Sequence, residues 1–351
     1  MQPTHPLLIR VVLVLFLSLS LLTVMGVSAN ENGRFLGAEE SEPPAWFKES
    51  FLDLAEDVRE AAANHKRVML YFHQAHCPYC SLLVKKNFTQ PDIAAAMRNN
   101  LESIAVDLWG DREVVATDGQ SHTEKSLAVA LKVNYTPTLI FLDEQGKVAL
   151  RLNGYYPPER FRLALDYVAG HKETQLSFHD YLGSRLAAAR DGTLHPEPFF
   201  MKPPYALARN RVPADRPLAV FFEQAHCVDC DRLHEQILAD PATRALVERF
   251  ETVQLDRQAD TPVITPGDER TTASAWARDL DLGYAPSIVF FDRRGQEVMR
   301  IDAFLKNFHV QSVFDYVLRE AYVTEPSFQR FLAARAERLR KEGADVDIGS
   351  H

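Results

Sequence analysis

Four cysteines carry the clearest potential for chemistry in this chain, and they form two pairs with identical spacing. Cys77 and Cys80 end the segment YFHQAHCPYC, and Cys227 and Cys230 end the segment FFEQAHCVDC. A first thiolate at this spacing can attack a disulfide of another molecule, and the second thiol can then release the product. The spacing therefore predicts thiol–disulfide exchange, with Cys77 and Cys227 attacking and Cys80 and Cys230 resolving. We expect one disulfide within each pair, Cys77–Cys80 and Cys227–Cys230.

The sequence around the first pair favours a reactive thiolate at Cys77. Residues 67–72 form a short β-rich run typical of a buried strand, and residues 81–88 contain no helix breaker. The pair is therefore expected on the first turn of a helix, where free backbone N–H groups and the helix dipole lower the pKa of a thiol below about 8.5. Pro78 suits the first helical position, where its missing N–H costs nothing.

A metal site and a purely structural disulfide are the alternatives for these cysteines. A CxxC pair can be half of a zinc site, but the two pairs lie 150 residues apart and neither has a second local pair. His73 and His76 could complete a local copper or zinc site beside the first pair, whereas only His226 precedes the second. We favour redox chemistry, and we expect no metal and no cofactor. His76 and His226 then either tune the thiolate or line the rim of the substrate site.

The cysteine motif belongs to a longer internal repeat. Six of ten positions are identical between residues 71–80 and 221–230, and YTPTLIFLDEQG (135–146) returns as YAPSIVFFDRRG (284–295). The later segment SFHDYL returns as SFQRFL, and the offset stays at 149 or 150 throughout. Because chance does not keep such matches in register, the chain is a tandem duplication.

The repeat divides the chain into two expected domains, at residues 44–190 and 218–340. Residues 191–217 are interpreted as a linker, because six prolines fall between His195 and Pro217. Within the first unit, hydrophobic periodicity and turn residues predict the following elements: a helix beginning near Trp46, a strand at 67–72, a helix at 81–88, a strand at 103–107, a helix at 124–132, hairpin strands at 138–142 and 147–152, and a helix at 160–169. This alternation predicts an α/β fold in which a mixed central sheet is flanked by helices on both faces.

These features together resemble the thioredoxin fold, which implies two tandem thioredoxin-like domains. A closer resemblance is to the periplasmic thioredoxins of sulfur-oxidation clusters, the SoxW type. It rests on LWGDREVVATDG (108–119), EKSLAVALKVNYTPTLIFLDEQGKV (124–148) and the terminal SFHDYL. The match covers essentially all of the first repeat, and the second repeat is similar to a diverged copy.

The resemblance implies a substrate-binding edge beside each cysteine pair. Pro137 and Pro286 are then expected to be cis and to face the disulfide. Thr136 and Ala285, which precede them, would present a backbone edge to an extended client segment.

The chain departs from ordinary thioredoxins at two positions in each repeat. His76 and His226 stand where those proteins carry a tryptophan. Tyr71 and Phe221 stand six residues before the first cysteine, where a buried acid is expected. Proton handling at the resolving thiol must therefore differ from that of an ordinary thioredoxin.

Composition and the first thirty residues restrict the location and the partners. The chain has 351 residues and a net charge of −9 without a basic stripe, which argues against nucleic acid as a partner. A weakly basic start, the apolar run Val11–Met25 and small residues before Asn30 have the layout of a secretory signal peptide at residues 1–29, cleaved after Ala29. An uncleaved anchor is the alternative, although the run is shorter than the ~20 residues that span a bilayer.

We therefore expect a periplasmic thiol–disulfide oxidoreductase that acts on protein disulfide or thiol clients. The SoxW-type resemblance implies a membrane electron-transfer thiol reductase as the donor. The alternative is a non-catalytic protein that binds copper, zinc or a client through its Cys/His pocket.

Overall fold

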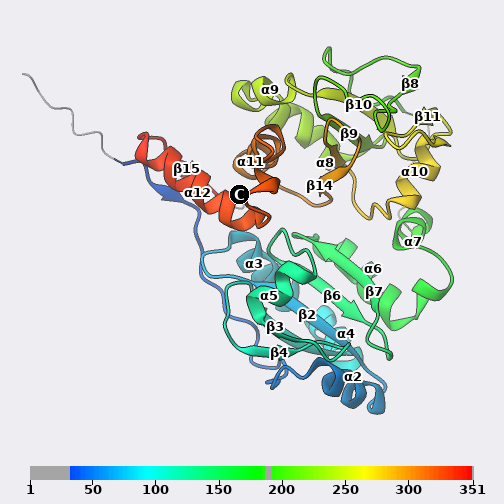
Figure 1. Cartoon of the computed structure of the whole chain (residues 1–351). Coiled ribbons are helices and arrows are strands. Elements are labelled where there is room, and N and C mark those ends of the chain that lie inside the picture. The colour runs from blue at the N-terminus through cyan, green and yellow to red at the C-terminus, as the bar shows by residue number, and fades with distance from the viewer. Residues whose placement is uncertain (1–31, 186–191, 350–351) are drawn as a thin grey trace, which may run out of the picture.

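The structure is a computed structural model that describes residues 32–185 and 192–349. Two domains of similar topology lie against each other, and the chain enters the second after completing the first (Figure 1). The signal peptide predicted for residues 1–29 and its cleavage after Ala29 lie outside the described residues. Within the described ranges, no helix is both long enough and apolar enough to cross a membrane.

The first domain is built on a four-stranded mixed sheet in the order β3-β2-β6-β7. The strands are β2 (Arg67–His73), β3 (Leu101–Asp107), β6 (Thr138–Leu142) and β7 (Val148–Asn153). Strand β2 pairs parallel with β3 and antiparallel with β6, and β6 and β7 form a hairpin. The helical segments are α2 (Leu54–Ala63), α3 (Pro78–Leu83), η1 (Val84–Phe88), α4 (Pro91–Asn100), α5 (Glu124–Ala130), α6 (Pro158–Ala169), η2 (Lys172–Thr174) and α7 (Phe178–Arg185), and a small hairpin joins β4 (Glu113–Val115) to β5 (Ser121–Thr123).

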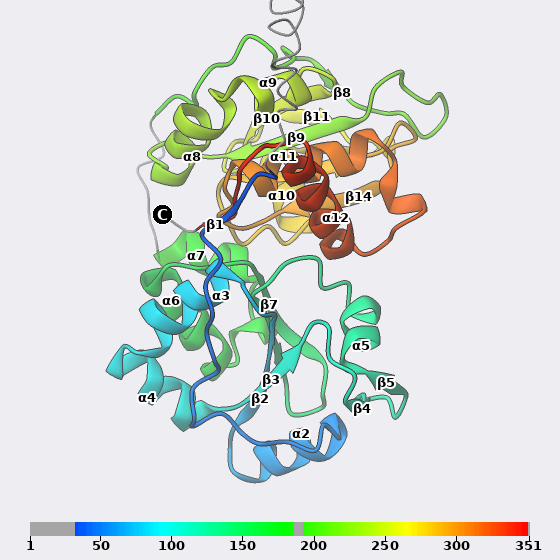
Figure 2. The same cartoon turned by 90° about the vertical axis from the view of Figure 1, so that its left-hand side faces the viewer.

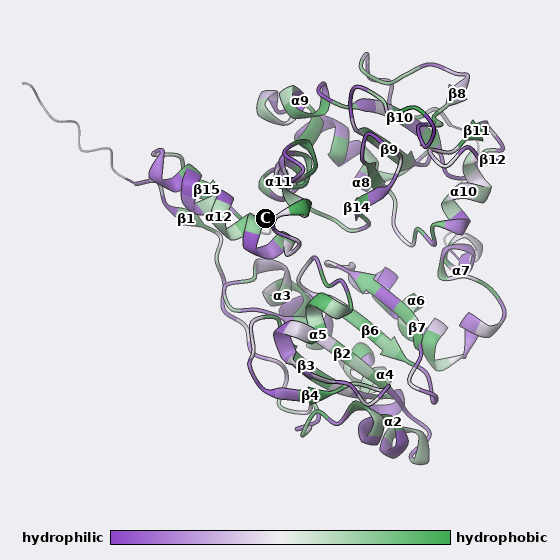
Figure 3. Ribbon diagram, viewed as in Figure 1, coloured by the Kyte–Doolittle hydropathy of each residue, from purple (hydrophilic) through white to green (hydrophobic). Residues whose placement is uncertain are grey.

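Strand alternation gives this sheet two buried faces. Val68, Leu70 and Phe72 of β2 belong to the core cluster that includes α2 and α5, whereas Met69 and Tyr71 belong to the cluster that includes α3, α4 and α6. The central strands are accordingly among the most apolar parts of the chain (Figure 3). The predicted α/β fold with helices on both faces of a mixed sheet is confirmed.

The second domain repeats this plan with the sheet order β10-β9-β13-β14. Its elements are β8 (Tyr205–Ala206), β9 (Leu218–Glu223), α8 (Val228–Arg232), η3 (Leu233–Leu238), α9 (Pro241–Val247), β10 (Glu251–Asp256), β11 (Pro262–Ile264), β12 (Arg270–Thr272), α10 (Ala273–Asp279), β13 (Ser287–Phe291), β14 (Glu297–Ile301), α11 (Asn307–Leu318), η4 (Ala321–Val323) and α12 (Phe328–Lys341). The short strands β1 (Phe35–Leu36) and β15 (Val346–Asp347) pair in parallel, so the two ends of the described chain meet.

The helix expected to begin near Trp46 instead begins at Leu54, after the N-cap Asp53. Trp46 and Phe47 lie before it in an arm whose backbone is fixed by a hydrogen bond from Lys48 N to the carbonyl oxygen of Ser103. The Phe47 ring packs edge-on against a core tyrosine of β2. Trp46 and Phe47 are therefore partly buried by tertiary contact, which hydrophobic periodicity alone does not distinguish from a helix face. Helix α4, which sequence reasoning did not predict, begins with a proline at its first turn.

The proline-rich segment interpreted as part of a linker at 191–217 packs against the second domain over much of its length. Phe200 packs edge-on against Phe221, and Met201 N donates to the carbonyl oxygen of Thr252. Strand β8 then pairs with β11. These contacts repeat those of the arm at Trp46–Lys48, so the structure places this segment within the second domain, upstream of residue 218. Proline favours an extended arm as readily as a linker, because it fixes φ near −65°.

The two domains are related by an approximate two-fold axis. Tyr155 and Phe304, which are equivalent in the repeat, form an antiparallel bridge with each other. The closing helix of each repeat contacts the other domain: His179 of α7 bonds the Leu282 carbonyl oxygen (2.9 Å), and Gln329 of α12 donates to the carbonyl oxygen of Asn134 (2.8 Å). Helix α7 lies at the boundary between the domains, and α12 begins at this boundary (Figure 2). Each cysteine pair is therefore positioned in a boundary region built by both repeats.

Candidate functional site

Each cysteine pair is a disulfide at the start of a helix. Cys77 is the N-cap of α3 and is bonded to Cys80, and Cys227 is the N-cap of α8 and is bonded to Cys230. In both sites the backbone N–H of the second cysteine points at the sulfur of the first, at 3.1 Å. That N–H would stabilise a thiolate on Cys77 or Cys227 once the disulfide is reduced. All four cysteine side chains are buried, and Cys77 is only 4% exposed.

The two predicted prolines lie beside the disulfides. The Thr136–Pro137 and Ala285–Pro286 peptide bonds are cis, which confirms the expectation drawn from the resemblance. The sulfur of Cys77 lies 3.6 Å from the Thr136 carbonyl oxygen, and that of Cys227 lies 3.5 Å from the Ala285 carbonyl oxygen. The structure thus brings the predicted cysteines, prolines and preceding residues into two matching sites.

The two histidines before the first cysteines adopt left-handed backbone conformations, with φ of 57° at His76 and 53° at His226. The His76 side chain is exposed, and its Nδ1 lies 2.5 Å from a carboxylate oxygen of Glu40. His76 therefore lies at the rim of the first site, as one of the two predicted roles requires. Among the described residues, no three His, Cys, Asp or Glu side chains are grouped as metal ligands.

A hydrogen-bonded group at the first site escaped the sequence analysis. Gln74 donates to the Thr136 hydroxyl (2.8 Å) and to the side-chain oxygen of Gln329 in α12 (3.0 Å). The Trp109 indole N–H donates to Gln74 (2.7 Å). The sequence marks Gln74 only by its identity with Gln224 in the repeated motif. That identity does not indicate its hydrogen-bond partners Trp109 and Gln329, which lie more than thirty residues away.

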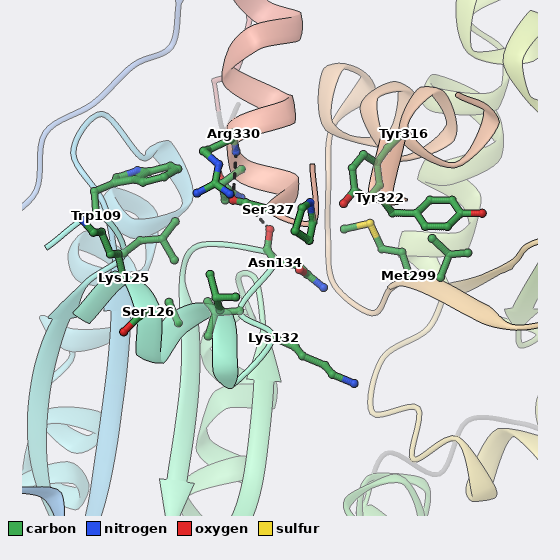
Figure 4. Close-up of a pocket in the computed structure, with 17 residues that line it drawn as sticks. Trp109, Lys125, Ser126, Lys132, Asn134, Met299, Tyr316, Tyr322, Ser327 and Arg330 are labelled. Atoms are coloured by element: carbon green, nitrogen blue, oxygen red, sulfur yellow. Dashed lines mark hydrogen bonds between the residues drawn. The ribbon is translucent and has the colours of Figure 1, made fainter. Parts of the chain in front are cut away.

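Trp109 and Gln329 also separate two cavities between the domains. One, of about 560 Å³, lies between α5 and the segment that leads into α12, with Lys125, Lys132 and Tyr322 among its lining residues (Figure 4). The other cavity, of about 600 Å³, lies on the other side of Trp109 and Gln329. Its lining includes Cys77, Tyr79 and Thr136.

At the second site, Asp229 lies between the two cysteines in sequence, but its charge is partly compensated. One carboxylate oxygen accepts a hydrogen bond from the Tyr284 hydroxyl (2.7 Å), and the other lies 3.3 Å from the guanidinium of Arg232. The first site has the uncharged Pro78 and Tyr79 between its cysteines. The two disulfides therefore differ in their local charge.

A buried ionic cluster borders the strand and helix that carry the second CxxC motif. His234 of η3 lies between Glu223 of β9 (3.0 Å) and Glu197 of the proline-rich arm (3.2 Å). Burial opposes the charge on His234, but the hydrogen bonds and charges of both glutamates outweigh it, so the pKa of His234 is raised above 6.5. His73 of β2 is the counterpart of Glu223 in the first repeat, and burial lowers the pKa of this histidine.

The His234 cluster is expected to make stability depend on pH. Because the folded-state pKa is raised, the stabilisation is fully present below pH 6.5 and is lost as pH rises through the folded-state value. The difference in unfolding free energy between wild type and His234→Gln should therefore shrink between about pH 6 and pH 8. The difference isolates His234, because the lowered pKa values of His73, His179 and His309 change the wild-type slope in the opposite direction. Urea unfolding at both pH values measures it, and the exposed His65→Gln is the matched control that should keep the wild-type slope. Equal slopes for wild type and His234→Gln would contradict the assignment.

Comparison with known proteins places both domains in one family. The sequence profile of the thioredoxin-like domain matches residues 54–169 and 207–318, so the chain belongs to the thioredoxin-like family. A search of the curated proteins gives no match.

Several solved structures are similar to part of the chain. A thioredoxin-fold protein from Helicobacter pylori is 21% identical, with a TM-score of 0.31, over 40% of this chain and 94% of that one. A thioredoxin from Thermus thermophilus is 23% identical, with a TM-score of 0.27, over 39% and 87% of the two chains. The reduced DsbD C-terminal domain from Neisseria meningitidis is 17% identical, with a TM-score of 0.26, over 34% and 93%. Together with the two CxxC disulfides, the family supports thiol–disulfide oxidoreductase chemistry in general.

Proposed function

We propose that the protein is a periplasmic thiol–disulfide oxidoreductase that reduces disulfides of protein clients. The observation that carries this proposal is the pairing, in both domains, of a CxxC disulfide at a helix start with the carbonyl oxygen before a cis-proline, at 3.5–3.6 Å. A client segment in extended conformation can pair with that backbone edge while its sulfur approaches Cys77 or Cys227.

The reaction follows from this geometry once the site is reduced. The Cys77 thiolate attacks one sulfur of a client disulfide, which forms a mixed disulfide and releases the other client sulfur as a thiolate that takes a proton from water. Cys80 then loses its proton and attacks the Cys77 sulfur, which releases the second client thiolate and restores the Cys77–Cys80 disulfide. Two electrons pass from the protein to the client in each cycle.

A reductant must regenerate the dithiol after each cycle. We propose a membrane electron-transfer thiol reductase in this role, which the resemblance to SoxW-type thioredoxins and the predicted signal peptide support. N-terminal sequencing of the protein from the periplasmic fraction should then find Asn30 first. A chain that retains Met1 in the membrane fraction would contradict the periplasmic proposal.

Insulin reduction with dithiothreitol as the electron donor tests the proposed activity. The mature protein should accelerate precipitation of the insulin chains catalytically, in proportion to its concentration. A protein that only binds copper, zinc or a client would give no turnover above the rate with dithiothreitol alone. Replacement of all four cysteines by serine is the control for turnover that does not depend on the two sites.

A further inference from the structure

We propose that the cavity between α5 and the start of α12 binds a medium-chain fatty acid as its free carboxylate. The inference goes beyond the proposed oxidoreductase function, because this ligand is neither a thiol nor a disulfide. The cavity has a volume of about 560 Å³, within the range of ligand pockets. Its walls come from both domains, with α5 and the residues after it on one side and α12 with the segment before it on the other (Figure 4).

The floor of this cavity is apolar. Leu108, Ala128 and Val133 of the first domain line it together with Met299 of the second, and all four side chains are buried. Trp109 also lines the cavity but is 40% exposed, so part of its ring faces solvent. An alkyl chain that enters the cavity would cover this apolar surface and remove its own hydrocarbon from water. The floor therefore favours a ligand with a hydrocarbon tail.

The rim of the cavity is positively charged. Lys125, Lys132 and Arg330 are exposed lining residues, and none of the described residues that line the cavity is acidic. Lys125 is paired with Asp111, and Arg330 is paired with Glu325 (2.8 Å). Lys132 forms no ion pair with another residue in the part of the chain that the structure describes. Its ammonium is therefore available to the head group of a ligand.

The buried floor and the exposed rim together select an amphipathic anion. The tail of a fatty acid would occupy the floor while its carboxylate remains at the rim, near Lys132 and partly in water. This position avoids the cost of burying an unpaired charge. A neutral alcohol of the same length would gain only the contacts of the floor, and an alkylamine would place a second cation beside Lys132.

The internal repeat shows that the thioredoxin-like fold does not require these cations. In the register of the repeat, Lys132 corresponds to Asp281 and Arg330 corresponds to Asp180. The equivalent positions at the other side of the domain boundary therefore carry the opposite charge, although both repeats have the same topology. The positive rim is a property of this cavity and not of the shared architecture.

Isothermal titration calorimetry with three ligands of one chain length tests the proposal. The oxidised mature protein is titrated at neutral pH and low salt with octanoate, octan-1-ol and octylamine. Octanoate should bind at one site per chain, about tenfold more tightly than octylamine, and octan-1-ol should lie between them. Absence of octanoate binding, or equal affinities for the three ligands, would overturn the proposal.

Charge reversal at Lys132 locates the site, and Lys147 offers a matched control. Lys147 is an exposed lysine of the same domain, in the β6–β7 turn, and it does not line the cavity. Lys132→Glu should weaken octanoate binding by about tenfold and strengthen octylamine binding by about tenfold, whereas Lys147→Glu should keep the wild-type affinities. A misfolded variant cannot produce the gain for octylamine.

The same profile in both glutamate variants would place the bound octanoate elsewhere and overturn the assignment to this cavity. Insulin reduction, which tests the proposed oxidoreductase function, does not depend on this result. The failure of either proposal is therefore distinguishable from the failure of the other.

Discussion

Replacement of Cys77 and Cys80 by serine is expected to lower the reduction of insulin disulfides by at least about 100-fold, because no thiolate remains beside the cavity of about 600 Å³ that Cys77 lines. The corresponding change at Cys227 and Cys230 should leave the rate within about threefold when dithiothreitol is the donor, since this small thiol can reduce Cys77–Cys80 directly. Initial rates of insulin precipitation, measured for both double variants at equal concentration, check the result. Circular dichroism of both variants controls for loss of the fold.

A trapping variant locates the attack independently. With Cys80→Ser the mixed disulfide on Cys77 cannot be resolved, so a client adduct should accumulate and should disappear on addition of dithiothreitol. Cys230→Ser should accumulate less adduct, because among the described residues a cavity of about 600 Å³ is lined by Cys77. Mass spectrometry of the trapped peptides identifies the cysteine that carries the client. A dominant adduct on Cys227, together with normal insulin reduction by the Cys77 and Cys80 double variant, would reverse the assignment of the two sites.

The sequence was sufficient for the features that depend on local pattern. The CxxC spacing, the strand before it and the proline before the β6–β7 hairpin are short-range signals, and the repeat doubled each of them. The arms were predicted less well. Hydrophobic periodicity predicts a helix at Trp46 and Phe47, and the six prolines after His195 predict a linker, although both segments are extended arms that pack aromatic rings against β2 or β9. Hydrophobic periodicity and proline content indicate only the local conformational preference of the backbone. The conformation of these arms is instead determined by their tertiary contacts with β2 and β9.

The local sequence pattern also does not predict how the two sites differ, because the difference depends on tertiary contacts. Gln74 and Gln224 are identical in the aligned motif, yet Gln74 joins a bond network with Trp109 and Gln329, whereas Gln224 borders a small cavity beside Arg257. Gln329 belongs to α12 of the second repeat, so this bond network forms only when the two domains pack against each other.

Arg67→Met is expected to destabilise the first domain by about 3 kcal/mol, the lower end of the effect of breaking a buried ion pair. Arg67 begins β2 and is 4% exposed. Its guanidinium bonds Glu144 of the β6–β7 turn through two nitrogens (2.9 and 3.1 Å), Glu173 (2.7 Å) and the Val168 carbonyl oxygen at the end of α6 (2.8 Å). The change leaves both carboxylates without their cation, and partial exposure of Glu144 keeps the loss moderate.

The pH dependence separates the loss of this ion pair from a loss of packing. The hydrogen bond from Arg67 lowers the pKa of Glu144 below 4.5 despite partial burial, so the stabilisation is present above pH 4.5 and is lost as pH falls through the folded-state value. The difference in unfolding free energy between wild type and Arg67→Met should therefore shrink on acidification, whereas a packing defect would persist. Urea unfolding at neutral and acidic pH measures it. The matched control is Arg59→Met, which replaces an exposed arginine on α2 whose guanidinium bonds the Ala55 carbonyl oxygen of its own helix. It should change stability by less than about 0.5 kcal/mol.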